Sequence, residues 1–303
     1  MPYAHIVCMA KILKRLKKKR KVRNIKRGKS NMDIFFYTII FIIGAFFGSF
    51  YTLAVYRIPK REDILVKHSY CPNCNHKLGF LDLFPIFSYI FLGGKCRYCK
   101  EKIRPRYLIL EVLSGTLFVL FAYLMGLNIE HLSVFKLIEF GFFVLYLTFI
   151  ILILGIDLEN KKIDKAVNIY GIVISIIYML YLCIVEKANI YRYGIYLVLY
   201  IVMLTLDTIT LKKYAKSTYV NGILIMLITM AIFVGEYITI ISIIYTLLII
   251  AVYLLLYKLK NRKRRKNVKT DKELSKQMPI GFYLGISNIL VLIVVMSYIT
   301  KIL

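Results

Sequence analysis

The sequence contains little of several residue types and patterns that mark common protein classes. The chain of 303 residues has no tryptophan, six prolines and 16 acidic residues against 43 lysines and arginines. No small-residue cleavage site follows the first apolar block, so nothing reads as a cleavable signal peptide. No Gly-x-Gly-x-x-Gly cofactor loop is present. No inverted repeat or pair of broken apolar segments is visible, which argues against a transporter that uses intramembrane acids as proton sites.

Apolar residues, in contrast, are abundant and are grouped in blocks. Hydrophobic residues make up 59% of the chain and the formal net charge is +27, a combination that soluble domains rarely show. The blocks are roughly 18 to 24 residues long, about what an α-helix needs to cross ~30 Å of hydrocarbon. The sequence predicts eight transmembrane helices, at 33–56, 107–127, 133–155, 166–185, 191–211, 218–234, 237–257 and 280–300.

Lysine and arginine are concentrated in alternate loops between these blocks. Residues 57–106 contain eleven basic residues and residues 258–276 contain ten, whereas the loops 128–132 and 235–237 contain none. This is the positive-inside pattern of multi-pass proteins. It predicts a protein of the cell membrane whose loop 57–106 faces the cytoplasm.

The basic stretch 11–29 conflicts with this assignment, because twelve lysines and arginines precede a helix whose start would lie outside. Three interpretations remain: the first helix is re-entrant, the basic tail is tolerated, or Met32 is the true start and residues 1–31 are an extension. We favour the third. The stretch has no aromatic residue to stack on bases, so we expect it to contact anionic lipid and not nucleic acid.

Two Cys-x-x-Cys pairs lie in the loop 57–106. Cys71 and Cys74 form the first pair, Cys96 and Cys99 the second, and 21 residues separate them. Four thiolates in two tight turns suit a closed, structural, tetrahedral zinc site. A cytoplasmic location keeps thiols reduced, which favours zinc over disulfides. Between the pairs, the amphipathic stretch 81–90 is expected to rest on the membrane surface or on the helix bundle.

Small and capping residues indicate how the helices begin and pack. Gly44, Gly48 and Ser49 lie on the first predicted helix, where small residues let helices approach closely. Asp164 precedes the fourth predicted helix and is most simply its N-cap.

Carboxylates in or near apolar segments are costly, so each is a functional candidate. Asp157 lies at the inner end of the third predicted helix, and Asp207 lies near the same boundary of the fifth. Two carboxylates that share a proton could act as an aspartic protease pair, in which one takes a proton from water and the other donates to the scissile carbonyl. The alternatives are a solvated helix end for Asp157 and a packed polar residue for Asp207. Glu111 could line the same site or cap the second helix.

The first half of the chain carries a series of motifs in a fixed order. They are Gly48-Ser49-Phe50 through Arg57-Ile58-Pro59, then Ser69-Tyr70-Cys71-Pro72-Asn73-Cys74, Asp82-Leu83-Phe84-Pro85-Ile86-Phe87-Ser88-Tyr89, and Gly94-Lys95-Cys96-Arg97-Tyr98-Cys99 followed by Ile103, Arg106-Tyr107 and Glu111. In this order the chain resembles the prepilin peptidases, the type IV leader peptidase and N-methyltransferase family. The resemblance covers roughly residues 40 to 215.

The resemblance implies an eight-helix aspartic protease of the inner membrane. Such an enzyme removes the leader of type IV prepilins or pseudopilins at the cytoplasmic face, and methylates the new amino terminus with S-adenosylmethionine. It implies zinc in the cysteine loop and catalytic roles for Asp157 and Asp207. The expected organisation is an extension at 1–31, a first transmembrane helix at 32–56, a tetra-Cys zinc domain at 57–106 and a peptidase bundle at 107–303.

The second half departs from the family pattern. The family places Ile-Pro-Asp after its first aspartate, whereas Ile163-Asp164-Lys165 follows Asp157 here. The family places Gly-x-Gly before its second aspartate, whereas both glycines are replaced before Asp207. We expect a divergent, active enzyme. The alternative is a catalytically impaired membrane scaffold that uses its zinc loop in pilus or competence assembly.

Overall fold

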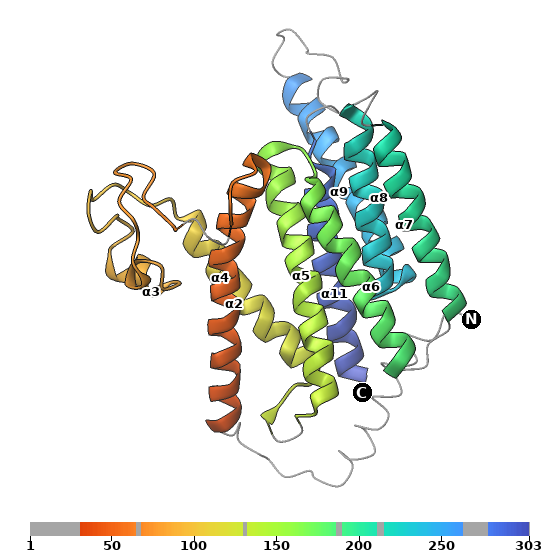
Figure 1. The fold of residues 1–303 in the computed structure, drawn as a ribbon, viewed down its shortest axis with the longest axis horizontal. Coiled ribbons are helices and arrows are strands. Elements are labelled where there is room, and N and C mark those ends of the chain that lie inside the picture. The colour runs from red at the N-terminus through yellow and green to blue at the C-terminus, as the bar shows by residue number, and fades with distance from the viewer. Residues whose placement is uncertain are drawn as a thin grey trace. The chain divides into compact units, whose positions relative to one another are not determined.

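The structure, a computed structural model, describes residues 31–64, 68–129, 132–185, 190–210, 215–262 and 278–302 (Figure 1). The described residues form helices and irregular loops and contain no strand, only two isolated β-bridges. The basic stretch 11–29, on which the choice of Met32 as a start depends, lies outside the described residues. The helices are α2 (Asn31–Arg57), η1 (Ile58–Lys60), η2 (Phe80–Asp82), α3 (Phe87–Phe91), α4 (Arg106–Leu124), α5 (Val134–Asn160), α6 (Lys165–Val185), α7 (Ile190–Thr210), α8 (Ala215–Val234), α9 (Glu236–Arg262) and α11 (Ile280–Ile302).

The prediction of an all-α membrane protein is confirmed. Among the described residues, each of the eight predicted spans corresponds to one long helix. Six of the helices in the described part of the chain are long and apolar enough to cross a membrane, and shorter apolar stretches lie at Tyr193–Leu206 in α7 and Tyr219–Val234 in α8. The helix ends differ from the predicted ends by a few residues. The largest differences are at the C-termini of α5 and α9, which both continue past their apolar blocks.

The chain divides into two compact units, which are described separately. In residues 25–144, α2 and α4 pack antiparallel to each other. A Cβ atom added to Gly44 would lie 2.9 Å from the Cα atom of Gly115, and one added to Gly48 would lie 2.7 Å from the Cα atom of Glu111. The prediction that Gly44 and Gly48 permit close helix packing is therefore confirmed.

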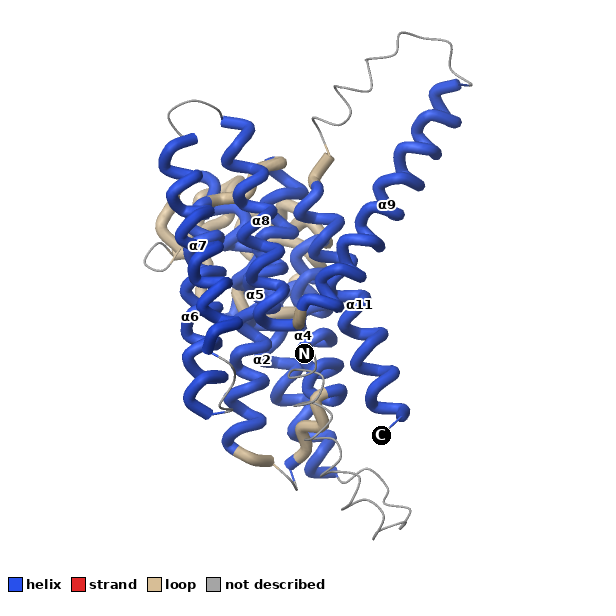
Figure 2. The backbone as a smooth tube through the Cα atoms, turned by 90° about the vertical axis from the view of Figure 1, so that its right-hand side faces the viewer, coloured by secondary structure: helices blue, strands red, loops and turns tan. Residues whose placement is uncertain are grey.

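Residues 145–303 form the other unit. Figure 2 shows α6, α7 and α8 side by side, with α9 and α11 beyond them. Buried hydrogen bonds connect its helices: the hydroxyl of Tyr146 donates to Asn288 at 2.6 Å, and the amide of Asn288 donates to Ser242 at 3.3 Å. These bonds join α5, α9 and α11. Asp164 caps α6, because its carboxylate accepts the backbone N–H of Ala166 at 2.8 Å, as predicted.

Candidate functional site

The first Cys-x-x-Cys pair forms a compact turn. The backbone N–H of Asn75 donates to the carbonyl of Cys71 at 2.8 Å, and the N–H of Cys71 donates to the carbonyl of His76 at 3.0 Å. Asn75 has a φ of 55°, which asparagine adopts more readily than most residues. Tyr70 and Lys77 then close the turn with an antiparallel bridge. The chain therefore reverses directly after Cys74 and holds both thiols on the same turn.

The second pair repeats this geometry 25 residues later. The N–H of Lys100 donates to the carbonyl of Cys96 at 3.1 Å, and the N–H of Cys96 donates to the carbonyl of Glu101 at 2.8 Å. Lys100 also has a positive φ, of 61°, and an antiparallel bridge joins Lys95 to Lys102. The two turns are thus local structural copies, although their sequences share little beyond the cysteines.

The two turns bring the four cysteines together. The Sγ atoms of Cys71, Cys74, Cys96 and Cys99 all lie within 4.8 Å of one another, and those of Cys71 and Cys99 are 3.8 Å apart. Tetrahedral zinc with bonds of ~2.3 Å separates its sulfur ligands by ~3.8 Å. None of the four forms a disulfide. The donor set and its spacing fit a zinc ion, and the backbone N–H of Glu101 helps to lower the pKa of the Cys99 thiol to about 7.

An ion pair ties the second turn to η2. The Nε atom of Arg97 lies 2.6 Å from Oδ1 of Asp82, and the hydroxyl of Tyr98 donates to Oδ2 at 3.2 Å. Burial opposes ionisation of Asp82, but the N–H of Gly79 and the Arg97 guanidinium outweigh it and hold its pKa below the ordinary value. The segment between the cysteine pairs is therefore fixed to the metal-binding turns.

Asp157 lies inside the unit formed by residues 145–303 and is 0% exposed. Its Oδ2 atom accepts hydrogen bonds from the hydroxyl of Tyr219 at 3.0 Å and from the backbone N–H of Phe282 at 3.0 Å. The Tyr219 hydroxyl in turn accepts the N–H of Ile280 at 2.8 Å. Oδ1 is buried and has no hydrogen-bond partner among the described residues. The alternative that Asp157 is a solvated helix end is therefore wrong, because α5 continues to Asn160 and α11 covers the carboxylate.

The structure does not test the predicted pairing of Asp157 with Asp207. Asp207 lies on α7, and its side chain is outside the described residues. The pair stays a prediction. Glu111 belongs to the other unit, where it is 8% exposed and accepts the N–H of Ile86 at 2.7 Å. Glu111 is therefore a buried anchor for the loop rather than an exposed cap of α4.

Sequence reasoning missed the partners of Asp157. Tyr219 and the first turn of α11 supply its hydrogen-bond donors, and they follow it by more than sixty and more than one hundred and twenty residues. The start of α11 could be predicted from the sequence, because Pro279 precedes an apolar block and proline is common at helix starts. The positive end of a helix dipole attracts carboxylates. No pattern in the sequence, however, tells which carboxylate meets which helix.

Comparison with known proteins finds similarity in the first half of the chain. Residues 42–125 match the bacterial peptidase A24 N-terminal domain. Over this range the chain is similar to the prepilin peptidases. The matched range includes the four cysteines, Asp82 and Glu111, so the predicted relationship is confirmed on the motifs that suggested it. No solved structure matches the chain.

The curated relatives are similar to the chain over part of their length. The prepilin leader peptidase/N-methyltransferase of Klebsiella pneumoniae is 32% identical over 102 residues, which cover 32% of this chain and 45% of the relative. That of Bacillus subtilis is 37% identical over 93 residues, covering 31% and 38%. That of Pseudomonas putida is 26% identical over 166 residues, covering 47% and 54%. The chain spans about half or less of the length of these relatives.

Proposed function

We propose that this chain is a membrane aspartic endopeptidase that removes the leader of type IV prepilins or pseudopilins at the cytoplasmic face, with Asp157 and Asp207 as its catalytic pair. The observation that carries the proposal is the A24 domain at residues 42–125, followed by a helical bundle that buries Asp157 completely. Buried carboxylates near hydrocarbon are costly and mark functional sites.

The environment of Asp157 supports a division of roles within the pair. The hydroxyl of Tyr219 on α8 and the backbone N–H of Phe282 at the start of α11 donate to Oδ2, and these donors fix the orientation of the carboxylate. Oδ1, without a partner among the described residues, is left to accept a proton from water. In this proposal Asp157 is the base, and Asp207 is the protonated acid that donates to the scissile carbonyl oxygen. Water adds to the carbonyl carbon, and the peptide C–N bond then breaks with proton transfer to the amine.

The cysteine cluster supports a structural metal site rather than a catalytic one. All four ligand positions of a tetrahedral zinc would be filled by thiolates, so no position is left open for water. Zinc would supply cross-linking of the two turns, which a loop of about fifty residues needs because it can bury little core of its own. The positive-inside pattern supports a cytoplasmic location for this loop.

Methyl transfer is implied by the names of the relatives, but the cavity beside α2 does not fit S-adenosylmethionine. Its lining is apolar except for Thr38, whose hydroxyl donates to the carbonyl of Ile34 in its own helix. Such a lining offers no groups to bind a charged sulfonium, a carboxylate and an adenosine. The proposal therefore includes methylation of the new amino terminus as an activity to measure, and derives no step for it.

Co-expression of the chain with a prepilin from the same genome tests the proposal. Mass measurement of the pilin reports leader removal and methylation together. We expect Asp157→Asn and Asp207→Asn each to lower cleavage roughly 100-fold or more, the scale of a lost acid or base. Asp164→Asn is the matched control, because asparagine also caps helices and the residue lies outside the proposed pair. Normal cleavage by either catalytic-pair variant would refute the assignment of that aspartate.

A catalytically impaired scaffold is the second candidate. The observation that favours it is that the domain match ends at residue 125, before either aspartate. This candidate predicts no cleavage by the unmodified chain, no effect of either aspartate substitution on pilus assembly, and loss of partner binding in Cys71→Ser.

A further inference from the structure

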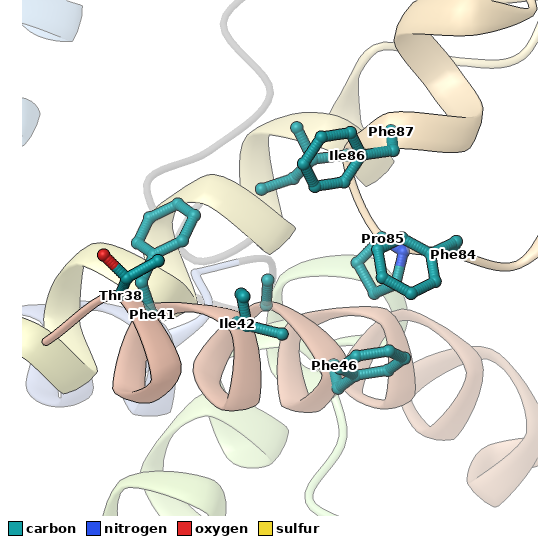
Figure 3. Close-up of a pocket in the computed structure, with 9 residues that line it drawn as sticks. Thr38, Phe41, Ile42, Phe46, Phe84, Pro85, Ile86 and Phe87 are labelled. Carbon is teal, nitrogen blue, oxygen red and sulfur yellow. The ribbon is translucent and has the colours of Figure 1, made fainter. Parts of the chain in front are cut away.

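Part of the loop between the cysteine pairs lies beside the middle of α2. A cavity of about 140 Å³ separates α2 from residues 84–87 (Figure 3). The rings of Phe46 and Phe84 are 5.4 Å apart across this contact. At a rise of 1.5 Å per residue, Ile42 lies about 22 Å from the end of α2 at Arg57. Residues 84–87 are therefore level with the interior of the helix and not beyond its end.

This depth matters because α2 is a candidate membrane span. Its apolar window is among the six that are long and apolar enough to cross a bilayer. Residues beside its middle therefore share the level of the hydrocarbon, which is ~30 Å thick. The lining of the cavity is compatible with that level, because Thr38 contributes its one hydroxyl and the other side chains are apolar. Apolar cavities of this kind exclude water.

The same segment carries an exposed apolar surface, which we call the 80–91 face, and one of its members, Phe87, also lines the cavity. Its five large side chains are each at least half exposed, and Phe91 reaches 83%. A contiguous apolar surface of this kind marks an interaction site. The members of the 80–91 face are Phe80, Leu81, Phe87, Ile90 and Phe91.

The backbone of the segment is suited to hydrocarbon. Non-helical backbone at membrane depth requires a partner for each polar group. The N–H of Ile86 donates to Oε2 of Glu111 at 2.7 Å, that of Ser88 to the carbonyl of Phe84 at 3.0 Å, and that of Leu92 to the carbonyl of Ser88 at 3.0 Å. The carboxylate of Asp82 is paired with Arg97 at 2.6 Å. The segment thus carries few polar groups that would need water.

Basic side chains surround the segment on the cysteine turns. Exposed lysines and arginines of this kind are attracted to anionic lipid headgroups, each by about 1 kcal/mol near the surface. Their charge complements a bilayer that contains anionic phospholipid, and it does not complement a second copy of the same basic loop. The exposed basic residues are Lys77, Lys95, Arg97, Lys100, Lys102 and Arg104.

We propose that residues 80–91 form a re-entrant segment whose 80–91 face is inserted into the acyl chains of one leaflet, while the basic cysteine turns contact anionic headgroups. The partner is the phospholipid bilayer itself. The inference does not depend on peptidase activity, because it rests on the loop and α2 alone.

The absence of tryptophan makes this insertion directly measurable. Phe91→Trp introduces a single fluorescent tryptophan on the 80–91 face, and Glu101→Trp introduces one on the exposed second cysteine turn as the matched control. Each full-length variant is reconstituted in vesicles of phosphatidylcholine and phosphatidylglycerol whose acyl chains carry bromine. We expect brominated chains to quench the tryptophan at 91 several-fold more than that at 101. Iodide in the buffer should show the reverse order.

Equal quenching of the two tryptophans by bromine, with equal access to iodide, would overturn the proposal. Dilution of the protein into more lipid shows whether the 80–91 face contacts the bilayer or a second copy of the chain, because contacts between chains are lost on dilution. An emission spectrum that stays blue-shifted on dilution supports insertion, and a spectrum that shifts to the red refutes it.

Replacing phosphatidylglycerol by phosphatidylcholine should reduce quenching at 91, and unchanged quenching would refute the role of anionic headgroups. Zinc content equal to that of the unmodified chain verifies that each variant is folded in the loop.

Discussion

The backbone N–H of Ile86 donates a 2.7 Å hydrogen bond to the carboxylate of Glu111, which lies 25 residues later on α4. Ile86 has a φ of 65°, a rare conformation for a β-branched residue. Such conformations cost about 1–3 kcal/mol and persist only where the surroundings hold them. Ser49 of α2 also hydrogen-bonds to Glu111. One buried carboxylate therefore joins the loop to both helices of its unit.

Replacing Glu111 tests this anchor. In Glu111→Ala the buried N–H of Ile86 loses its acceptor, which costs about 1–3 kcal/mol. Glu111→Gln keeps a carbonyl oxygen at the position and should cost less. We expect hydrogen exchange of the peptide 84–92 to accelerate about 10-fold or more in the alanine variant, because ~1.4 kcal/mol corresponds to a factor of ten. Glu101→Ala, an exposed glutamate on the second cysteine turn, is the control. Unchanged exchange in Glu111→Ala would show that the bond does not hold the loop.

The parts of this structure that could be predicted from sequence are those with local patterns. Apolar blocks of membrane-spanning length predict the long helices, and the Cys-x-x-Cys pairs predict the sulfur cluster, because each pattern needs only neighbouring residues. Glu111 was recognisable as a candidate by its position in an apolar block. Its partner, the backbone N–H of Ile86, could not be predicted, because every residue except proline has a backbone N–H and the residue type does not show which one forms the bond.

The contacts of Asp157 illustrate the same limit. A predicted helix that ends at residue 155 suggests that Asp157 lies in water, whereas α5 continues for five residues beyond that end. Burial of the carboxylate depends on α8 and α11, which lie far away in the chain. The exposure of a residue at a helix end depends on how distant helices assemble, and local sequence does not encode that arrangement.

Metal removal should unfold the cysteine loop. We expect purified, reduced protein to contain about one zinc ion per chain, because four thiolates fill a tetrahedral site. Cys71→Ser and Cys96→Ser should each lose most of the metal, since either change removes one of the four ligands. Cys183→Ser is the matched control, because Cys183 lies on α6 in the other unit and is a free thiol. Metal analysis by mass spectrometry measures the outcome. Full zinc content in both loop variants would contradict the site.

Close packing of α2 on α4 should not tolerate a side chain at position 48. A Cβ atom there would lie 2.7 Å from the Cα atom of Glu111 and 2.8 Å from the carbonyl oxygen of Leu110, so backbone must move. We expect Gly48→Ala to destabilise the protein by about 1–3 kcal/mol, the cost of overpacking. Gly141→Ala is the matched control, because nothing lies within 4 Å of a Cβ atom at that helical position.

The control should be neutral or stabilising by about 0.5–1 kcal/mol, because alanine favours helix over glycine. Thermal unfolding in detergent, followed by circular dichroism, compares the two variants. Equal midpoints for Gly48→Ala and the unmodified chain would contradict the close approach of the helices.

Tyr219 should matter for both the stability and the reaction of the Asp157 site. Its hydroxyl donates to Asp157 of α5 and accepts the N–H groups of Ile280 and Gly281, so Tyr219→Phe removes three hydrogen bonds. Each is worth about 0.5–1.5 kcal/mol, and we expect a lower unfolding midpoint together with slower prepilin cleavage. Tyr298→Phe, whose ring is largely exposed, is the matched control.

The two effects of Tyr219→Phe can be separated by the pH dependence of cleavage. Loss of a hydrogen-bond donor to Asp157 changes the balance between its protonated and ionised forms, so the acid limb of the rate profile should change its position on the pH axis. A purely structural role would lower the amount of active protein and leave that limb in place. A profile that keeps its position while the unfolding midpoint falls would limit Tyr219 to holding α11 against α5, and would remove it from the chemistry of the pair.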